Sequence, residues 1–132
     1  MLCIGQVHDL NLRESNVVDV SSLRGVHKLN LFGCQEVVNV GALGQVHDLN
    51  LGYCGNIVDV STLGGLHTLN LWNCKGVVDF SALGQVHDLN LRNSNVVDVS
   101  ALIGVHKLDL SFCDRLVNVS ALGQVLGKAQ LK

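Results

Sequence analysis

The sequence contains no proline in its 132 residues, and aromatic residues make up only 4% of it. No run of apolar residues approaches the roughly 20 that a helix needs to cross a bilayer. The net charge is only −2, which does not favour a nucleic acid or an acidic membrane surface. We therefore expect neither nucleic acid nor membrane to be a partner of this protein.

No basic segment followed by an apolar one opens the chain, which begins MLCIGQVHDL. Such a segment would indicate secretion. Without it, the five cysteines favour reduced thiols over a disulfide framework. We therefore expect a cytoplasmic protein. Cys3 lies ahead of the first full repeat described below, and we expect it to be exposed and reactive.

The main feature that is present is a unit of 19 or 20 residues, repeated along the chain and recognisable by the motif V-H-x-L. Its first positions are Val7, Val26, Val46, Leu66, Val86, Val105 and Val125. They define six full copies, 7–25, 26–45, 46–65, 66–85, 86–104 and 105–124, with partial copies at 1–6 and 125–132. We expect the whole chain, 1–132, to form a single domain.

The start of each unit predicts a short strand. Leucines at positions 4 and 6 alternate with polar residues at 3 and 5, as in HDLNL (47–51), which indicates one buried face. The rest of the unit is too short for a second long element, so it is expected to return as extended chain or a 3₁₀ turn. Stacked copies then form one parallel sheet with strands ~4.8 Å apart, and each coil buries its apolar side chains against its neighbours.

The segment VHDLNLGYC (46–54) follows the pattern L-x-x-L-x-L-x-x-(N or C), and similar segments recur in all six copies. The unit therefore resembles the leucine-rich repeat, over about nine-tenths of the chain. Its second half, NVVDVSSL (16–23), resembles internalin repeats but is shorter and lacks their proline. The resemblance implies an α/β-class leucine-rich-repeat solenoid, nearly all β with loops and 3₁₀ turns. It also implies that the single parallel sheet lies on the concave face and that no helix is long.

The resemblance further implies that position 9 is an inward-facing ladder residue that satisfies backbone groups of the loop after the strand. This position is Cys34, Cys54, Cys74 and Cys113 in the 20-residue copies, and Ser15 and Ser94 in the 19-residue copies. A thiol suits the wider turn, whereas a hydroxyl followed by asparagine suits the tighter one. We interpret the cysteines as inert structural thiols; metal binding or oxidation is the alternative.

All the histidines occupy position 2, so stacking of the coils should place them in one row at ~5 Å intervals. They are His8, His27, His47, His67, His87 and His106. The favoured interpretation is a ladder of neutral imidazoles, each bonded to its neighbour or to the backbone. A divalent metal site and a row that repels itself when protonated are the alternatives.

Positions 3, 5, 7 and 8 are expected to point outward from the sheet, and positions 7 and 8 hold aromatic and arginine side chains. These residues are Arg13, Phe32, Tyr53, Trp72, Arg92 and Phe112. Aromatic residues flanked by arginine are typical of interface hot spots. The alternative is that they only cover the edge between strand and loop.

Position 5 is nearly constant, and its asparagines extend this candidate surface. It includes Asn30, Asn50, Asn70 and Asn90, with Asp109 in the sixth copy. Such a row predicts either an amide ladder that satisfies itself or a polar strip that contacts a partner. Both interpretations stay open at this stage.

Reactive side chains recur in columns of one type and do not form a mixed set of nucleophile, base and orienting group. We therefore predict no enzyme, no catalytic residue, no bound metal and no cofactor. The favoured function is a protein-binding module that uses the concave sheet and its aromatic rim. The alternatives are a structural module that associates with itself through uncapped repeat ends, as a homodimer or end to end, and a metal- or pH-responsive histidine row.

The motif V-H-x-L-x-L…D-V-S-A-L-G also resembles the repeats of proteins that are expanded in large DNA viruses of amoebae and in protists. That resemblance implies a host protein as the partner. It also implies a location in the host cytoplasm or in the virion.

Overall fold

The chain folds into a stack of coils, each with one short strand. The computed structural model describes residues 7–117 and 129–130. Its strands are β1 (Asp9–Asn11), β2 (Lys28–Asn30), β3 (Asp48–Asn50), β4 (Thr68–Asn70), β5 (Asp88–Asn90), β6 (Lys107–Asp109) and β7 (Ala129–Gln130). Its 3₁₀ turns are η2 (Ser21–Leu23), η3 (Gly41–Leu43), η4 (Leu63–Gly65), η5 (Ser81–Leu83) and η6 (Ser100–Leu102).

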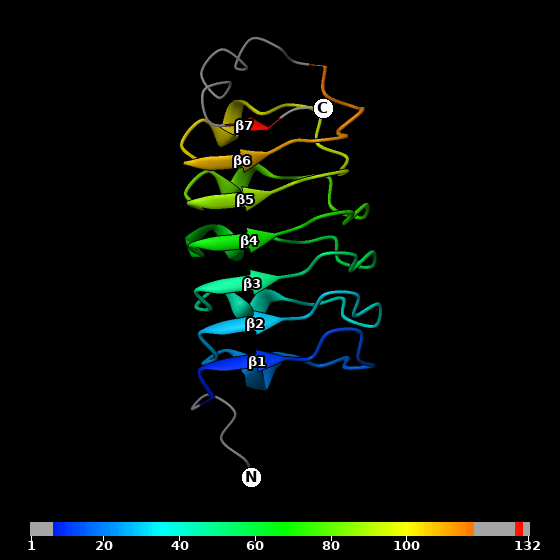
Figure 1. Ribbon diagram of the computed structural model, residues 1–132, viewed down its shortest axis with the longest axis vertical. Coiled ribbons are helices and arrows are strands. Elements are labelled where there is room, and N and C mark those ends of the chain that lie inside the picture. Colours follow the sequence, from blue (N-terminus) through cyan, green and yellow to red (C-terminus); the bar gives the residue numbers. More distant parts are fainter. Residues whose placement is uncertain (1–6, 118–128, 131–132) are drawn as a thin grey trace.

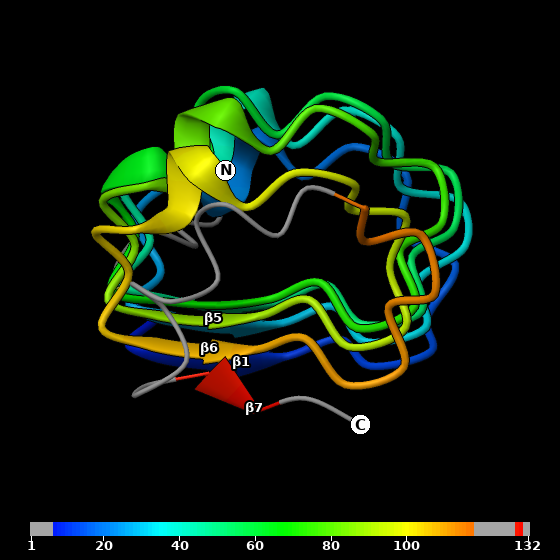
Figure 2. The same ribbon diagram turned by 90° about the horizontal axis from the view of Figure 1, so that it is seen from above.

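All the strands pair in parallel and in chain order, from β1 to β7, so that each coil lies on the next (Figure 1). The register joins equivalent positions: Leu29 of β2 lies opposite Leu49 of β3, and Asn30 lies opposite Asn50. Viewed along the stack, the sheet forms one side of the coil and the 3₁₀ turns lie on the opposite side (Figure 2). The predicted solenoid with one parallel sheet and no long helix is therefore confirmed.

The last strand differs from the sequence alignment by one residue. Alignment on Val125 places Lys128 opposite Leu108, whereas the pairing of β6 with β7 places Ala129 there. The first residue of the last partial copy lies outside the described residues, so its start at Val125 stays a prediction.

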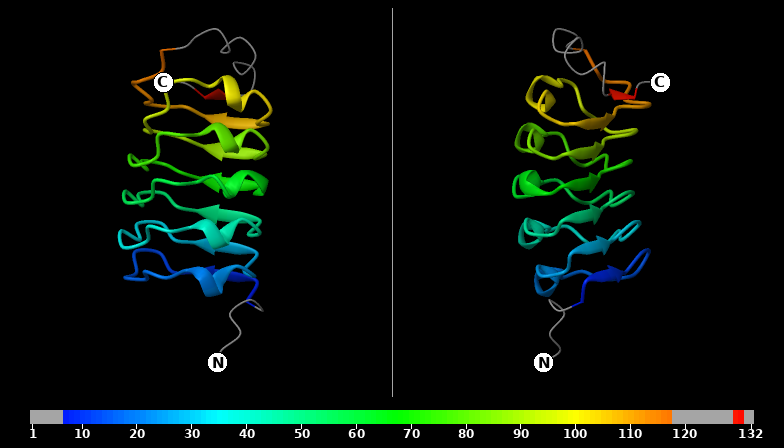
Figure 3. Two further views of the ribbon diagram at one scale, coloured as in Figure 1. Left: turned by 180° about the vertical axis from the view of Figure 1, so that it is seen from behind. Right: turned by 60° about the vertical axis from the view of Figure 1, so that its left-hand side comes forward.

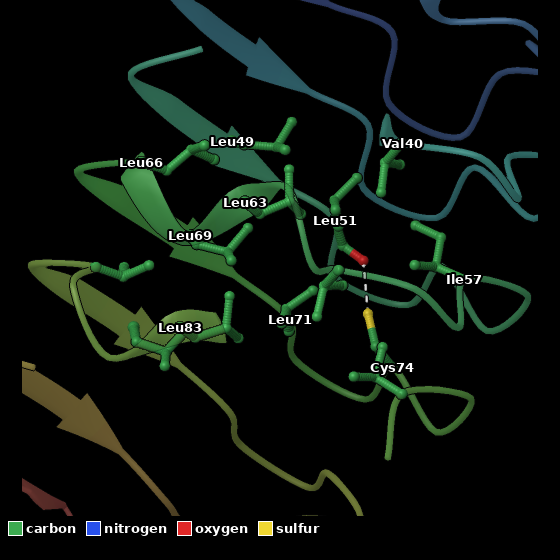
Figure 4. Packing of buried hydrophobic residues seen from close by; sticks show 14 of the residues in the cluster. Val40, Leu49, Leu51, Ile57, Leu63, Leu66, Leu69, Leu71, Cys74 and Leu83 are labelled. Atoms are coloured by element: carbon green, nitrogen blue, oxygen red, sulfur yellow. Dashed lines mark hydrogen bonds between the residues drawn. The ribbon is translucent and has the colours of Figure 1, made fainter. Parts of the chain in front are cut away.

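The core lies inside the coils and continues from one coil to the next. In each inner coil the buried side chains come from the strand, the turn after it, the return segment and the 3₁₀ turn. In Figure 4, Leu49, Leu51 and Ile57 point into this interior, and Leu51 and Ile57 have no exposed surface. Burying a side chain of this size stabilises by roughly 1.5–3 kcal/mol. Because each coil packs only on its neighbours, this stabilisation accumulates along the stack.

A carboxylate or amide fixes the start of the 3₁₀ turns η2, η3, η5 and η6. Asp19 Oδ1 accepts a hydrogen bond from the backbone N–H of Ser21 at 2.9 Å, and Asn39 does the same for Gly41. Hydrogen bonds from Ser21 hold the pKa of Asp19 below its usual value. Figure 3 shows these turns stacked behind the sheet in successive coils.

Three sequence predictions lie outside the described residues: the exposure of Cys3, the lack of a cap at 1–6, and the structure of most of 125–132. Within the part of the chain that the structure describes, no helix is long and apolar enough to span a membrane.

Candidate functional site

The chain leaves every strand of β1–β6 through the same tight turn, in which position 8 adopts a positive φ. The angles are 58° at Glu14, 73° at Gly33, 59° at Tyr53, 57° at Asn73, 54° at Asn93 and 60° at Phe112. Glycine and asparagine tolerate this left-handed region. For other residues it costs roughly 1–2 kcal/mol, so the Tyr53 and Phe112 rings stand at strained backbone positions.

The asparagine column holds this turn in place. Asn30 Oδ1 accepts the backbone N–H of Phe32 at 2.9 Å, and Asn70 Oδ1 accepts that of Trp72 at 2.8 Å. Asp109 does the same for the N–H of Ser111 at 2.9 Å. The expected amide ladder is therefore wrong, because each oxygen bonds the turn of its own coil.

The remaining amide nitrogens of this column lie along the outer face of the sheet. Among the described residues, no hydrogen-bond partner is found for Nδ2 of Asn30, Asn50, Asn70 and Asn90. The column borders two shallow grooves, of which the one over β1–β4 has a volume of about 410 Å³. Lys28 and Asp48 pair across this face at 3.9 Å, with the lysine exposed and the aspartate half-buried; such a surface contact is worth less than about 1 kcal/mol.

The turns bring the aromatic and arginine side chains into one continuous cluster. We call Arg13, Phe32, Tyr53, Trp72, Arg92 and Phe112 the aromatic rim. The Phe32, Tyr53 and Trp72 rings contact one another, with centroids 5.1 Å apart for Tyr53 and Trp72 and 6.1 Å apart for Phe32 and Trp72. Tyr53 remains 36% exposed and Phe112 48% exposed.

The two arginines of the rim lie over aromatic faces. The Arg13 guanidinium is 4.6 Å from the Phe32 ring centroid. The Arg92 guanidinium is 5.5 Å from the Trp72 ring and 5.0 Å from the Phe112 ring, so it joins the two. Each such contact contributes about 0.5–1 kcal/mol at an exposed site. These contacts therefore hold the rim in shape.

Gly52 provides the space for the centre of this cluster. A Cβ atom at Gly52 would lie 2.8 Å from Cδ2 of Phe32. Because that atom is missing, the Phe32 ring lies over the neighbouring coil and approaches Trp72. Gly52 is not among the residues that the sequence predicts for this surface. It is the only glycine in the position 7 column, which is the signal that could have identified it.

The cysteine column links each coil to the previous one, and the predicted cysteine ladder is confirmed. The Cys54 thiol donates to the carbonyl oxygen of Leu31 at 3.1 Å, and the Cys74 thiol to that of Leu51 at 2.9 Å (Figure 4). Cys34 and Cys113 make the same contact at 3.0 Å. Burial raises the pKa of Cys54 to about 11 and that of Cys74 to about 12, so both thiols stay protonated at neutral pH.

The serines at the same position lie beside the thiol of the next coil. Ser15 Oγ is 3.6 Å from Cys34 Sγ, and Ser94 Oγ is 3.5 Å from Cys113 Sγ. The Asn95 side chain donates to the carbonyl oxygen of Lys75, in the preceding coil, at 2.7 Å. The shorter copies thus keep a side-chain bond to the neighbouring coil.

The histidines form a stack of parallel rings at the start of the strands. Successive centroids from His8 to His106 are 4.4–4.7 Å apart, and the ring planes differ by 10–25°. The rings contact one another by stacking. The Nδ1 atoms of four of them bond to the following side chain, as in His47 to Asp48 at 2.6 Å; these four are His8, His47, His67 and His87. The expected bonds from ring to ring or from ring to backbone are therefore wrong.

This stacking does not favour a metal site. The donor atoms of His47, Asp48 and His67 lie within 4.8 Å of one another. The His47 and His67 rings are stacked, however, with centroids 4.7 Å apart and planes only 10° apart, so their nitrogen lone pairs lie in two nearly parallel planes. A zinc ion needs such lone pairs to converge on one point at about 2.0–2.1 Å.

No protein-family model and no curated protein sequence matches the chain. Among solved structures, the internalin inlF from Listeria monocytogenes aligns with 97% of this chain at 19% identity and a TM-score of 0.66. Internalin C2 of the same bacterium aligns with 97% at 18% identity and a TM-score of 0.69. The alignments cover 47% and 72% of those two chains, so this chain spans about half the length of the first. The repeat pattern, the single parallel sheet and these similarities together show that the chain has the leucine-rich-repeat fold.

Proposed function

We propose that the protein is a non-catalytic module that binds a protein partner through the aromatic rim and the adjoining outer face of the sheet. The observation that favours this function is the placement of Tyr53 and Phe112. Both rings are exposed by more than a third, and both stand on a left-handed backbone. Strain of this kind clusters at functional sites. Asparagine, which tolerates this backbone, occupies the same position in two other copies, as Asn73 and Asn93.

The rim has the composition and rigidity of a binding hot spot. Aromatic and arginine residues dominate the energetics of protein interfaces. Contacts among Phe32, Tyr53 and Trp72 restrict the rings in the free protein. Less side-chain entropy is therefore lost when a partner binds.

The charges and donors around the rim indicate the chemistry of the partner. Arg13 and Arg92 lie at opposite ends of the Phe32–Trp72 cluster, which favours acidic groups at both ends of an apolar segment. The amide nitrogens of Asn50 and Asn70 can donate hydrogen bonds, which favours a partner with acceptors such as backbone carbonyl oxygens. We therefore propose that the partner presents an apolar, partly acidic segment.

The chemistry of the reactive side chains favours binding over catalysis. The Cys54 and Cys74 thiols are buried and have raised pKa values, which disfavours the nucleophilic thiolate. The histidines stack on one another at the other end of the strands. A nucleophile and its base would have to lie within about 3.2 Å of each other.

A quantitative pull-down from a cell lysate tests this proposal. Wild type, Phe32→Ala/Trp72→Ala and the matched control Gln45→Ala/Gln85→Ala would be compared after circular dichroism has shown equal folding. The control glutamines are exposed and lie next to the histidine stack, away from the rim. A partner held by wild type and control but lost by the rim variant supports the proposal. Equal retention by all three proteins, or no retained protein at all, overturns it.

A further inference from the structure

The return segments of the coils lie on the side away from the sheet (Figure 2). Each of them carries an exposed valine, and these valines form one column. We call it the valine stripe. The exposed fractions are 63% at Val18, 57% at Val38, 58% at Val58, 70% at Val78, 45% at Val97 and 72% at Val117. Every described coil contributes one valine, and no charged residue interrupts the column.

The other constant columns have an explanation inside the chain. Asn70 caps the turn after its strand, Asp59 bonds the N–H of Ser61, and the Cys74 thiol bonds a carbonyl oxygen. Other surface columns vary between copies, as the column of Ala42, Thr62 and Ala82 does.

The valine stripe is constant although its side chains are largely exposed. A β-branched residue suits the extended backbone, but threonine has the same shape and would expose less apolar surface. Six valines out of six therefore indicate a contact made outside the chain.

We propose that the valine stripe is the interface of a homodimer, covered by the same stripe of a second copy. The six side chains together expose roughly 500 Å² of largely apolar surface, which is at the upper end of the patches found on monomers. Two stripes and their polar borders would bury more than the roughly 1,000 Å² that a specific interface requires. A twofold interface joins the same patch of both copies, so one uniform column is sufficient to form it.

The charges beside the stripe favour one arrangement of the two copies. Asp59 and Asp79 lie on the side of the stripe that follows it in the chain, whereas Asn56 and Gly76 lie on the side that precedes it. When both stacks run in the same direction about a twofold axis along the stripe, each acidic border lies over the other copy's mostly neutral border. Antiparallel stacks would instead bring the acidic borders together, at an electrostatic cost.

This interface is separate from the aromatic rim and goes beyond the proposed function. The dimer would present two rims at once, which raises the apparent affinity for a partner with two matching segments. Substitutions in the valine stripe should leave the aromatic rim of each chain intact. The test of the dimer and the test of partner binding can therefore fail independently.

Sedimentation equilibrium of the full chain tests the dimer. Wild type should sediment as a closed dimer, and Val38→Ser/Val58→Ser/Val78→Ser should weaken the dimer at least about 100-fold. Substitutions at exposed positions should leave the circular dichroism spectrum unchanged. A wild-type monomer at millimolar concentration, or a dimer that persists in the triple variant, overturns the proposal. Growth of the mass beyond a dimer would also overturn it, because it indicates end-to-end association.

Disulfide trapping tests which face is buried. In a Cys3→Ser background, Val58→Cys should form a disulfide with the same residue of the second copy on mild oxidation. The exposed control Gln45→Cys, at the histidine edge, should not. Val18→Cys should also cross-link if both stacks run in the same direction. Equal cross-linking at 45 and 58 overturns the stripe as the interface. Cross-linking at 58 without cross-linking at 18 supports the valine stripe as the interface but overturns the arrangement in which both stacks run in the same direction.

Discussion

Replacing Gly52 with alanine tests whether the aromatic rim depends on the missing side chain at this position. The added Cβ atom would lie 2.8 Å from Cδ2 and 3.0 Å from Cε2 of Phe32. Carbon atoms pack at about 3.5–4.0 Å, so the Phe32 ring has to move outward. We expect it to lose its contact with Trp72, whose ring centroid lies 6.1 Å away.

Two opposing effects set the size of the change in stability. Overpacking of this kind costs about 1–3 kcal/mol. Alanine also restricts the unfolded chain, which returns about 0.4–1 kcal/mol when the native backbone suits it. The backbone at Gly52 is outside the left-handed region, so we expect the free energy of unfolding to fall by about 1 kcal/mol.

Urea unfolding followed by tryptophan fluorescence measures both effects, because Trp72 is the only tryptophan of the chain. We expect a lower urea midpoint and a red-shifted native emission for Gly52→Ala. Gly55→Ala is the matched control, since its Cβ would meet only Gln35 Oε1, at an ordinary 3.6 Å. If Gly52→Ala were as stable as Gly55→Ala and its emission matched the wild type, the argument about Phe32 would be refuted.

Cys74→Ala removes the thiol bond to Leu51 and leaves a small cavity, so the free energy of unfolding should fall by about 1–2 kcal/mol in a urea titration; no loss would exclude a stabilising ladder. Because burial raises the pKa of Cys54 to about 11 and that of Cys74 to about 12, both should react with a thiol reagent at pH 8 only when the chain unfolds. Fast labelling of the native protein would contradict their burial. Hydrogen bonds from Ser81 keep the pKa of Asp79 below 3.8, so its contribution to stability is complete above that value and is lost as the pH falls through the lower folded pKa. Asp79→Asn should therefore flatten the acid loss of stability in urea titrations below about pH 4; an unchanged slope would contradict this.

The repeat period and the alternation of leucines were sufficient to predict the stack and its sheet. A unit of 20 residues allows one strand and a return, and equivalent leucines such as Leu49 and Leu69 then have to lie opposite each other. The last partial copy, 125–132, loses the His and Leu spacing, so the sequence pattern does not give its register. The backbone pairing of Ala129 with Leu108 shows the actual register.

The role of the asparagine column was not determined by its constancy. An amide ladder requires asparagine at every step, because each side chain must both donate and accept a hydrogen bond. A cap for the turn needs only an oxygen that accepts one, so aspartate can replace asparagine there. Asp109 has no amide N–H to donate, and in the structure it caps the turn as Asn90 does. That single exchange in the sequence was the signal for the correct interpretation.

The strained turns and the valine stripe could not be predicted from the sequence, because both depend on the path by which the backbone closes each coil. Gly33 and Asn73 indicate a left-handed position in the sequence, but Tyr53 in the same column conceals it. In the segment VVD, the pattern does not show which of two adjacent valines faces solvent. The structure buries Val77 and leaves Val78 70% exposed.

Pairing between adjacent coils has a consequence for how such a chain changes in evolution. Every strand pairs only with the strands before and after it, as β3 does with β2 and β4. Duplicating one 20-residue copy would therefore lengthen the molecule by about 4.8 Å without breaking an existing type of contact. The distance between Arg13 and Arg92, now four coils, could be adjusted in equal steps to the length of a ligand, while each coil kept its own fold.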